Sequence, residues 1–155
     1  MLLTSGQMCE ICGIGHQMLI RLVAAGVITP ALRGRGKGRH HAFGPVNLSA
    51  LGAYVSMTQA GCPVAQAVAA AMWIQKVGWD ALKEQINNGK TFLVVFGEEV
   101  IDPLLCEDRA SEVGDILQKA KNRPLPIAIS NLEKAFEMVC ELMEQEKSKS
   151  ASVLA

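Results

Sequence analysis

The amino-acid sequence predicts a mainly α-helical fold with a small β component. Apolar residues recur at helical spacing through most of the first half, and glycines and prolines divide that half into short segments. Residues 91–96, Thr-Phe-Leu-Val-Val-Phe, are the best strand candidate because they combine β-branched and aromatic side chains. Half of the 155 residues are hydrophobic, which favours a packed core over a disordered chain.

Two short helices are expected first. Thr4 and Gln7 have the spacing of a capping box, and the helix that they begin ends at Gly13. A second helix follows over about residues 15–25 and ends at Gly26. Its apolar face holds Leu19, Leu22 and Val23, and the opposite face holds His16, Gln17, Ile20, Arg21 and Ala24. Residues 27–30 then continue in extended form, because the residue before a proline avoids the helix.

A basic, glycine-rich segment comes next, and we call residues 33–41 the basic loop. Its glycines alternate with cations and two histidines follow: Arg33, Arg35, Lys37, Arg39, His40 and His41. Such a composition cannot build a core. It predicts a flexible or hairpin loop that carries four positive charges.

The remaining elements are shorter or more mixed. Helices are expected over about residues 48–59, 63–76, 80–87 and 108–121, and a short strand at residues 127–129. Ser130 or Asn131 is expected to cap a last helix. The apolar face of that helix holds Leu132, Phe136, Val139, Cys140 and Met143. We therefore divide the chain into an N-terminal domain (1–76), a C-terminal region (80–147) and a flexible tail (148–155).

The formal net charge of zero is the sum of two halves of opposite sign. Residues 1–79 hold six Lys or Arg and one acid, Glu10, for a net charge of +5. Residues 80–155 hold nine Lys or Arg and fourteen acids, for a net charge of −5. This asymmetry indicates a polyanion-binding face on the first half and a partner or solubility role for the second.

The composition also indicates the cellular compartment of the protein. The longest apolar runs fall short of the roughly 18–20 residues that a membrane span needs. The first residues have no basic patch and no long apolar core, so no secretory signal is expected. The five cysteines have no framework spacing. We therefore expect a reduced, cytoplasmic protein with no membrane partner.

Two short helices joined by a glycine turn and followed by a basic hairpin are the plan of a winged helix-turn-helix. The predicted fold is thus a winged helix-turn-helix followed by a small α+β region for dimerisation or partner binding. In this plan the first helix braces the second, which enters the major groove of double-stranded DNA. The hairpin then places its cations along the phosphates or in the minor groove.

Residues 12–30 resemble the MerR family of transcription regulators, because they match its turn, recognition helix and exit without a gap. The characteristic positions are Gly13, Leu19, Gly26 and Pro30. Gly38 and Arg39 followed by Phe43 are similar to the family's wing motif, with altered spacing. Residues 61–64 resemble the break before its fourth helix. The resemblance covers about residues 2–75 and implies a DNA-binding module.

The sequence also departs from that family. Two arginines and a tyrosine typical of its recognition helix are Gln17, Ile20 and Arg21 here, and Ile20 cannot replace an arginine contact. The long coiled-coil helix that dimerises typical members is not evident after residue 76. We therefore expect a MerR-like module with an altered contact set and an atypical C-terminal half.

DNA contacts are expected from the second helix and from the basic loop. Arginine commonly reads guanine, and glutamine can pair with adenine. Cations of the loop contact phosphates without reading sequence. For each residue the alternative is a solvated surface side chain. The predicted contact residues are His16, Gln17, Met18, Arg21, Arg33, Arg35, Lys37, Arg39, His40 and His41.

Other chemistries have weaker signals. Cys9, Cys12 and His16 have ligand-like spacing, but no second cysteine pair completes a zinc site. Residues 34–39 lack the Gly-Lys-Ser/Thr of a P-loop, and no histidine–cysteine pair has the context of a nucleophilic site. We expect no metal, no cofactor and no enzymatic activity.

The sequence therefore predicts a sequence-specific, nucleoid-associated transcription regulator of a bacterium or phage that binds double-stranded DNA as a homodimer. Dimerisation is expected through the strand at residues 91–96 and the last helix, although that helix face could equally be a core face. The residues concerned are Phe92, Val94, Phe96, Leu132, Phe136, Val139 and Met143. The C-terminal region is also a candidate site for a small-molecule or protein effector.

Two alternatives to a promoter regulator stay open. The first is an architectural DNA-binding protein, or a phage recombination or packaging protein, which would bend DNA or bind it in arrays. The second is a protein-interaction adaptor or antitoxin-like protein that acts through the acidic C-terminal half. Cooperative binding with little sequence preference would indicate the first. Partner binding that survives deletion of residues 1–76 would indicate the second.

Overall fold

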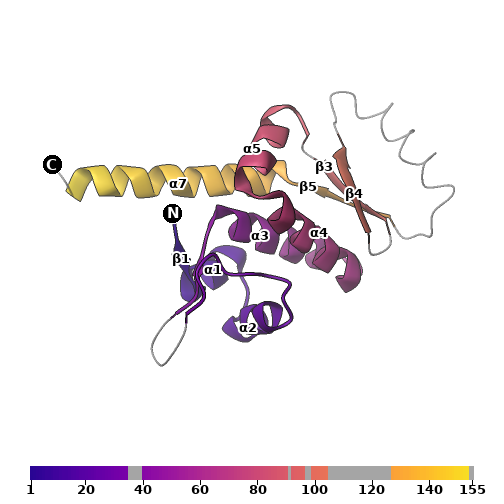
Figure 1. Cartoon of the computed structure of the whole chain (residues 1–155), viewed down its shortest axis with the longest axis horizontal. Coiled ribbons are helices and arrows are strands. Elements are labelled where there is room, and N and C mark those ends of the chain that lie inside the picture. Colours follow the sequence, from indigo (N-terminus) through magenta and orange to yellow (C-terminus); the bar gives the residue numbers. More distant parts are fainter. Residues whose placement is uncertain (35–39, 91, 97–98, 105–126, 154–155) are drawn as a thin grey trace.

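The computed structural model describes residues 1–34, 40–90, 92–96, 99–104 and 127–153. They form the mainly α-helical fold with a small β component that the sequence predicts (Figure 1). The described helices are α1 (Ser5–Cys12), α2 (His16–Ala24), α3 (Pro45–Gln59), α4 (Val64–Val77), α5 (Trp79–Asn87) and α7 (Glu133–Val153). The described strands are β1 (Leu3–Thr4), β2 (Ala42–Phe43), β3 (Phe92–Phe96), β4 (Glu99–Leu104) and β5 (Ile127–Asn131). None of these helices has both the length and the apolar character that a membrane crossing requires.

The first helix begins and ends where the local sequence places it. Thr4 is the N-cap of α1, and its Oγ1 accepts a hydrogen bond from the Gln7 N–H at 3.3 Å. The Thr4 N–H donates in return to Gln7 Oε1 at 2.8 Å, which completes the predicted capping box. The helix ends at Gly13, whose φ of 64° lies in the left-handed region that favours glycine.

A two-stranded sheet closes the base of the basic loop. β1 pairs antiparallel with β2, with Leu3 opposite Phe43. Next to this pair, Leu32 and Ala42 exchange two backbone hydrogen bonds of 3.0 Å each. The two ends of the basic loop are therefore held together as in a hairpin, while residues 35–39 lie outside the described residues. The sequence does not indicate β1, because a two-residue strand is too short to show periodicity.

The central helix of the core is α3. It packs against α1, α4, α7 and β5, and its buried side chains lie on nearly every side of the helix. A helix that is apolar all round is expected to be buried. The structure starts this helix at Pro45 rather than near residue 48, and proline is tolerated in the first turn because its missing N–H would have no helical partner.

A three-stranded antiparallel sheet packs against α4. Its strand order is β4-β3-β5, and Leu93 and Val95 of the middle strand are fully buried. β3 confirms the strand predicted at residues 91–96, with residue 91 outside the described residues. The sequence does not indicate β4, because Asp102 and Pro103 are unfavourable in strands. Its place at the edge of the sheet explains the proline, since one side of an edge strand has no partner.

The last helix differs from the prediction at both ends. Ser130 and Asn131, the predicted caps, lie in β5, and α7 begins at Glu133. At its other end α7 continues to Val153, so the flexible tail predicted from residue 148 is helical through Val153. The Ser148 hydroxyl donates to the Glu144 carbonyl at 3.1 Å, a local bond that lets a serine remain inside a helix. The helix predicted over residues 108–121 lies outside the described residues.

Candidate nucleic-acid interface

The second helix has a buried side and an exposed side. Leu19 and Leu22 are buried in the core, and α1 packs against α2. The exposed side carries every contact residue that the sequence predicts on this helix: His16, Gln17, Met18 and Arg21. Ile20 is 46% exposed. The sequence predicts no arginine-type DNA contact from this position. α2 therefore offers polar and cationic side chains together with two apolar ones, Met18 and Ile20.

The exit from α2 is anchored to the core. The Leu22 carbonyl accepts hydrogen bonds from the N–H groups of Val27 and Ile28, at 2.9 and 3.2 Å. Gly26 has a φ of 74°, which permits this sharp reversal, and Val27 and Ile28 are buried immediately after it. The helix end is thus fixed on the side away from the exposed contact residues.

Two amide side chains hold the segment that follows α2. Gln75 of α4 accepts a hydrogen bond from the Thr29 N–H at 2.7 Å and donates to the Val27 carbonyl at 2.6 Å. Asn47 of α3 donates to the Thr29 carbonyl at 2.8 Å and to Gln75 Oε1 at 3.2 Å. Asn47 Oδ1 also accepts from the Gly44 N–H at 2.9 Å. These bonds connect α3 and α4 to the exit of α2 and thereby limit how α2 can tilt.

The sequence does not predict the role of these two amide side chains. One signal could have found them, because Gln75 is one of only three polar residues in α4, with Gln66 and Lys76. A polar side chain in such a helix usually has a backbone partner when it is buried. Asn47 gives no comparable signal, since asparagine in a first helical turn is ordinary.

The described part of the basic loop lies beside α2. Arg33 and His40 are exposed, and His41 is partly buried. The Gly34 N–H donates to His41 Nδ1 at 3.3 Å, and the His41 ring meets Phe43 edge-on with ring centroids 6.3 Å apart. His41 is therefore held in place from both sides. The predicted contacts Arg35, Lys37 and Arg39 lie outside the described residues.

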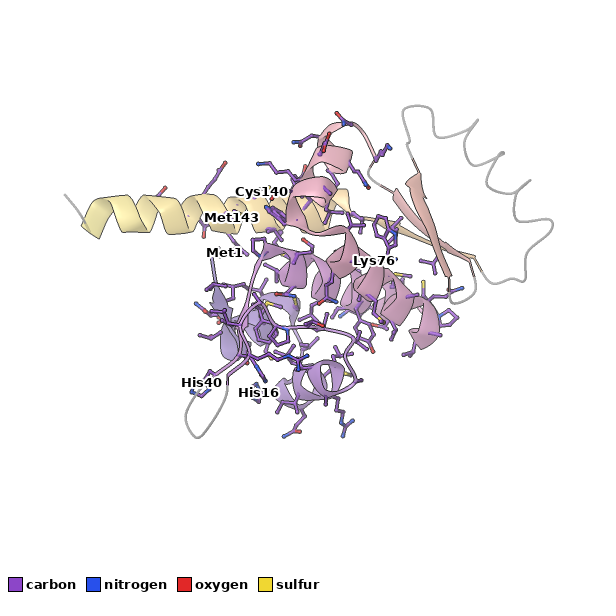
Figure 2. The ribbon with its side chains drawn as sticks, viewed as in Figure 1. Met1, His16, His40, Lys76, Cys140 and Met143 are labelled. Carbon is purple, nitrogen blue, oxygen red and sulfur yellow. The ribbon has the colours of Figure 1, made fainter. Side chains whose placement is uncertain are left out.

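A pocket of about 420 Å³ lies between α2 and the base of the basic loop. It is lined by Ser5, His16, Leu19, Ile20, Val23, Ala24, His40, His41 and Phe43. Figure 2 shows His16 and His40 at the same end of the molecule, beside α2. The structure thus brings three predicted contact residues together, while Gln17, Met18, Arg21 and Arg33 lie outside the lining.

The residues predicted for dimerisation have mixed surroundings. Leu132 and Val139 are 3% and 0% exposed within this one chain, and Phe136 stacks on Trp79 with centroids 5.3 Å apart. Met143 is partly buried against the same core. This packing agrees with the alternative of a core face for the last helix. The dimerisation role that the sequence assigns to these four residues therefore requires contacts beyond the ones they already make.

The strand predicted for dimerisation is the middle strand of its sheet. Phe92, Val94 and Phe96 lie in β3, which pairs with β4 on one side and β5 on the other. A second copy therefore cannot add a strand beside β3. The side chains of these three residues lie outside the described part of the structure.

Three thiols of the described residues have raised pKa values and are therefore protonated at neutral pH. Burial raises the pKa of Cys12 to about 11, with a further increase from the neighbouring Cys9 thiol. Burial also raises the pKa of Cys9 and of Cys140. Since the thiolate is the nucleophile, these protonated thiols are weak nucleophiles at neutral pH. Among the described residues, no group of three or more His, Cys, Asp or Glu side chains is placed to hold a metal ion.

Comparison with known protein families and curated proteins identifies no relative of this chain. No protein-family model matches the chain, and no curated protein matches it closely enough to indicate a relationship. The resemblance of residues 12–30 to the MerR family therefore stays a prediction from the sequence.

Proposed function

We propose that this protein is a transcription regulator that binds specific double-stranded DNA sequences through a MerR-like winged helix-turn-helix. One observation carries the proposal: His16, Ile20 and Ala24 of α2 line one pocket together with His40, His41 and Phe43 at the base of the basic loop. A helix and an adjacent basic hairpin on one surface are what a duplex requires, because its major groove admits the helix while the flanking backbone meets the cations.

The residues divide into two tasks under this proposal. Gln17 and Arg21, exposed on α2, read base edges in the major groove. Arg33 and the other cations of the basic loop contact phosphates, which position the protein and carry no sequence information. Met18 and Ile20 supply apolar contacts, for which the thymine methyl group is the natural partner in the major groove.

Electrostatics support the choice of a nucleic acid as the partner. Residues 1–79 carry a net charge of +5, and their one acid is Glu10. Glu10 lies on α1 and does not line the pocket beside α2. An approaching duplex therefore meets positive charge with little local repulsion, and its phosphates displace counterions.

The rigid support of α2 also favours sequence reading. The hydrogen bonds of Gln75 and Asn47 fix the segment after α2, and α1 packs against α2 from the other side. Base readout requires side chains held within a fraction of an ångström of their productive positions. A helix braced in this way is suited to a defined set of bases.

The homodimer is part of the same proposal. Figure 1 shows α7 extending past α1 and β1, so its last turns project from the rest of the chain. Ser148 in this stretch is exposed. An isolated helical stretch of this length is marginal in water without tertiary packing. A second copy of α7 would supply that packing and would place two α2 helices on successive turns of a duplex.

Selection of genomic fragments by the purified protein, over a series of salt concentrations, tests the proposal. We expect the retained and sequenced fragments to share a palindromic motif that survives physiological salt. The matched control is the Gln17→Ala, Arg21→Ala double variant, which removes both base-reading side chains from the exposed side of α2. It should retain fragments only at low salt and without the motif.

The other outcomes contradict the proposal in different ways. Salt-labile retention by the unchanged protein without any motif would indicate an architectural DNA-binding protein. No retention at any salt concentration would remove DNA as the partner. It would direct attention to the acidic C-terminal region and its protein partners.

A further inference from the structure

The pocket beside α2 contains every histidine of the chain. The sequence has three histidines, and His16, His40 and His41 all line this pocket. They come from different elements, since His16 begins α2 and the other two precede β2. Leu19 and Phe43 are buried beneath them and provide an apolar floor.

We propose that this pocket binds a backbone phosphate of DNA and that protonation of His16 and His40 makes the binding pH-dependent. The inference depends on the proposed function and specifies one contact of the same interface. Its consequence is that DNA affinity rises as the pH falls, because a protonated imidazole binds an anion more strongly than a neutral one.

The three imidazoles have different tasks. His41 Nδ1 accepts the Gly34 N–H at 3.3 Å, so the proton of the neutral ring is on Nε2, which is left to donate to a phosphate oxygen. His16 and His40 are exposed and no described side chain is paired with them. Each can therefore take up a proton and donate a charge-assisted hydrogen bond, the stronger kind.

The charged surroundings leave this charge without an internal partner. Among the described residues, no carboxylate lines the pocket. Glu10 on α1 is the one acid in residues 1–79, and it is exposed outside the pocket. Arg21 and Arg33 are exposed beside the pocket without lining it. An anion from outside the chain is thus what protonated His16 and His40 would bind.

The size and the lining of the pocket fit a phosphate that is still attached to its sugar. A volume of about 420 Å³ is larger than a bare phosphate needs. The apolar floor of Leu19 and Phe43 can accept the face of a deoxyribose, while the histidines surround the charged end. The backbone of a duplex offers this combination at every nucleotide.

Fluorescence anisotropy with the selected duplex, from pH 5.5 to 8.0 at constant ionic strength, tests the inference. We expect Kd to be about tenfold lower at pH 5.5 than at pH 8.0. The His16→Gln, His40→Gln double variant should bind the duplex with an affinity that no longer increases between pH 8.0 and pH 5.5. Both positions are exposed, so the fold should tolerate the change.

A matched control separates the pocket from the rest of the interface. Arg21→Gln lies on the same helix outside the pocket and should lower affinity equally at every pH. The NMR signals of the histidine rings provide a second readout, because the chemical shifts of His16 and His40 should change when the duplex is added.

The outcomes distinguish this inference from the proposed function. DNA binding whose pH dependence is absent, or is unchanged in the double variant, would overturn the phosphate pocket and leave the DNA-binding proposal intact. Absence of DNA binding at every pH would overturn both.

Discussion

Gln75 Oε1 accepts a hydrogen bond from the backbone N–H of Thr29 at 2.7 Å, across 46 residues of sequence. The same amide donates to the Val27 carbonyl at 2.6 Å. A single side chain of α4 therefore satisfies two backbone groups in the segment that leaves α2. This relationship couples the stability of the core to the orientation of the helix proposed to enter DNA.

Replacement of Gln75 by leucine tests that coupling. Gln75→Leu leaves the Thr29 N–H and the Val27 carbonyl without their partner, and we expect the free energy of unfolding to fall by about 1–3 kcal/mol. Urea denaturation measures this change. Gln59→Leu, at the exposed end of α3, is the matched control and should change stability by no more than about 0.5 kcal/mol. Equal losses of stability in the two variants would show that the hydrogen bonds of the Gln75 side chain do not stabilise the fold.

Arg21 should distinguish specific from random DNA. If Arg21 reads a base, Arg21→Ala weakens binding to the selected motif by about 1–3 kcal/mol and weakens random DNA less. Lys83→Ala removes an exposed cation from α5 and serves as the control for net charge. An equal loss on both kinds of DNA would reassign Arg21 to a phosphate contact.

The basic loop should determine the salt dependence. Arg35→Ala and Arg39→Ala should each weaken binding to all sequences and reduce the slope of log K against log salt by about one unit. Lys76→Ala, an exposed cation at the end of α4, should leave that slope unchanged. Wild-type slopes in both loop variants would remove the basic loop from the interface.

Val139 tests whether the last helix packs on its own chain or on a second copy. It is 0% exposed here, so Val139→Ala should lower the free energy of unfolding by about 1.5–3 kcal/mol. That loss should be independent of protein concentration, because the contacts are made within one chain. Val64→Ala, at a site that is 60% exposed, is the control and should be nearly neutral. A loss that disappears at high protein concentration would instead place Val139 in a dimer interface.

The Cys12 thiol should be slow to alkylate. Burial raises its pKa to about 11 from an ordinary value of 9.0, so at pH 9 about one Cys12 in a hundred is a thiolate. Iodoacetamide labelling followed by mass spectrometry should show Cys12 reacting far more slowly than a free cysteine peptide in the same solution.

The same shift predicts the sign of a stability change. The folded chain holds the Cys12 proton more tightly than the unfolded chain, so its contribution to stability is complete below about pH 9 and is lost as the pH rises towards about 11. The difference in unfolding free energy between the unchanged protein and Cys12→Ala should therefore shrink over that range. A constant difference would contradict the raised pKa.

Several elements could be predicted because their signals are local. The capping box of Thr4 and Gln7, the stop at Gly13 and the strand at β3 each depend on residues within one or two turns of one another. The exposed side of α2 was predictable for the same reason, since helical periodicity assigns Leu19 to the core and Arg21 to the surface. The proposed base-reading residues belong to this local category.

Other features depend on residues that are distant in the sequence, and only the tertiary structure decided them. β4 forms because β3 offers it an edge, although its own residues disfavour a strand. The core position of Val139 depends on what covers it, and periodicity cannot say whether an apolar helix face meets its own chain or another. The histidine pocket and the hydrogen bonds of Gln75 join residues that lie too far apart in the sequence for a local pattern to reveal them. Local propensity thus determined which segments become helices and strands, and packing determined which faces were buried and which side chains met.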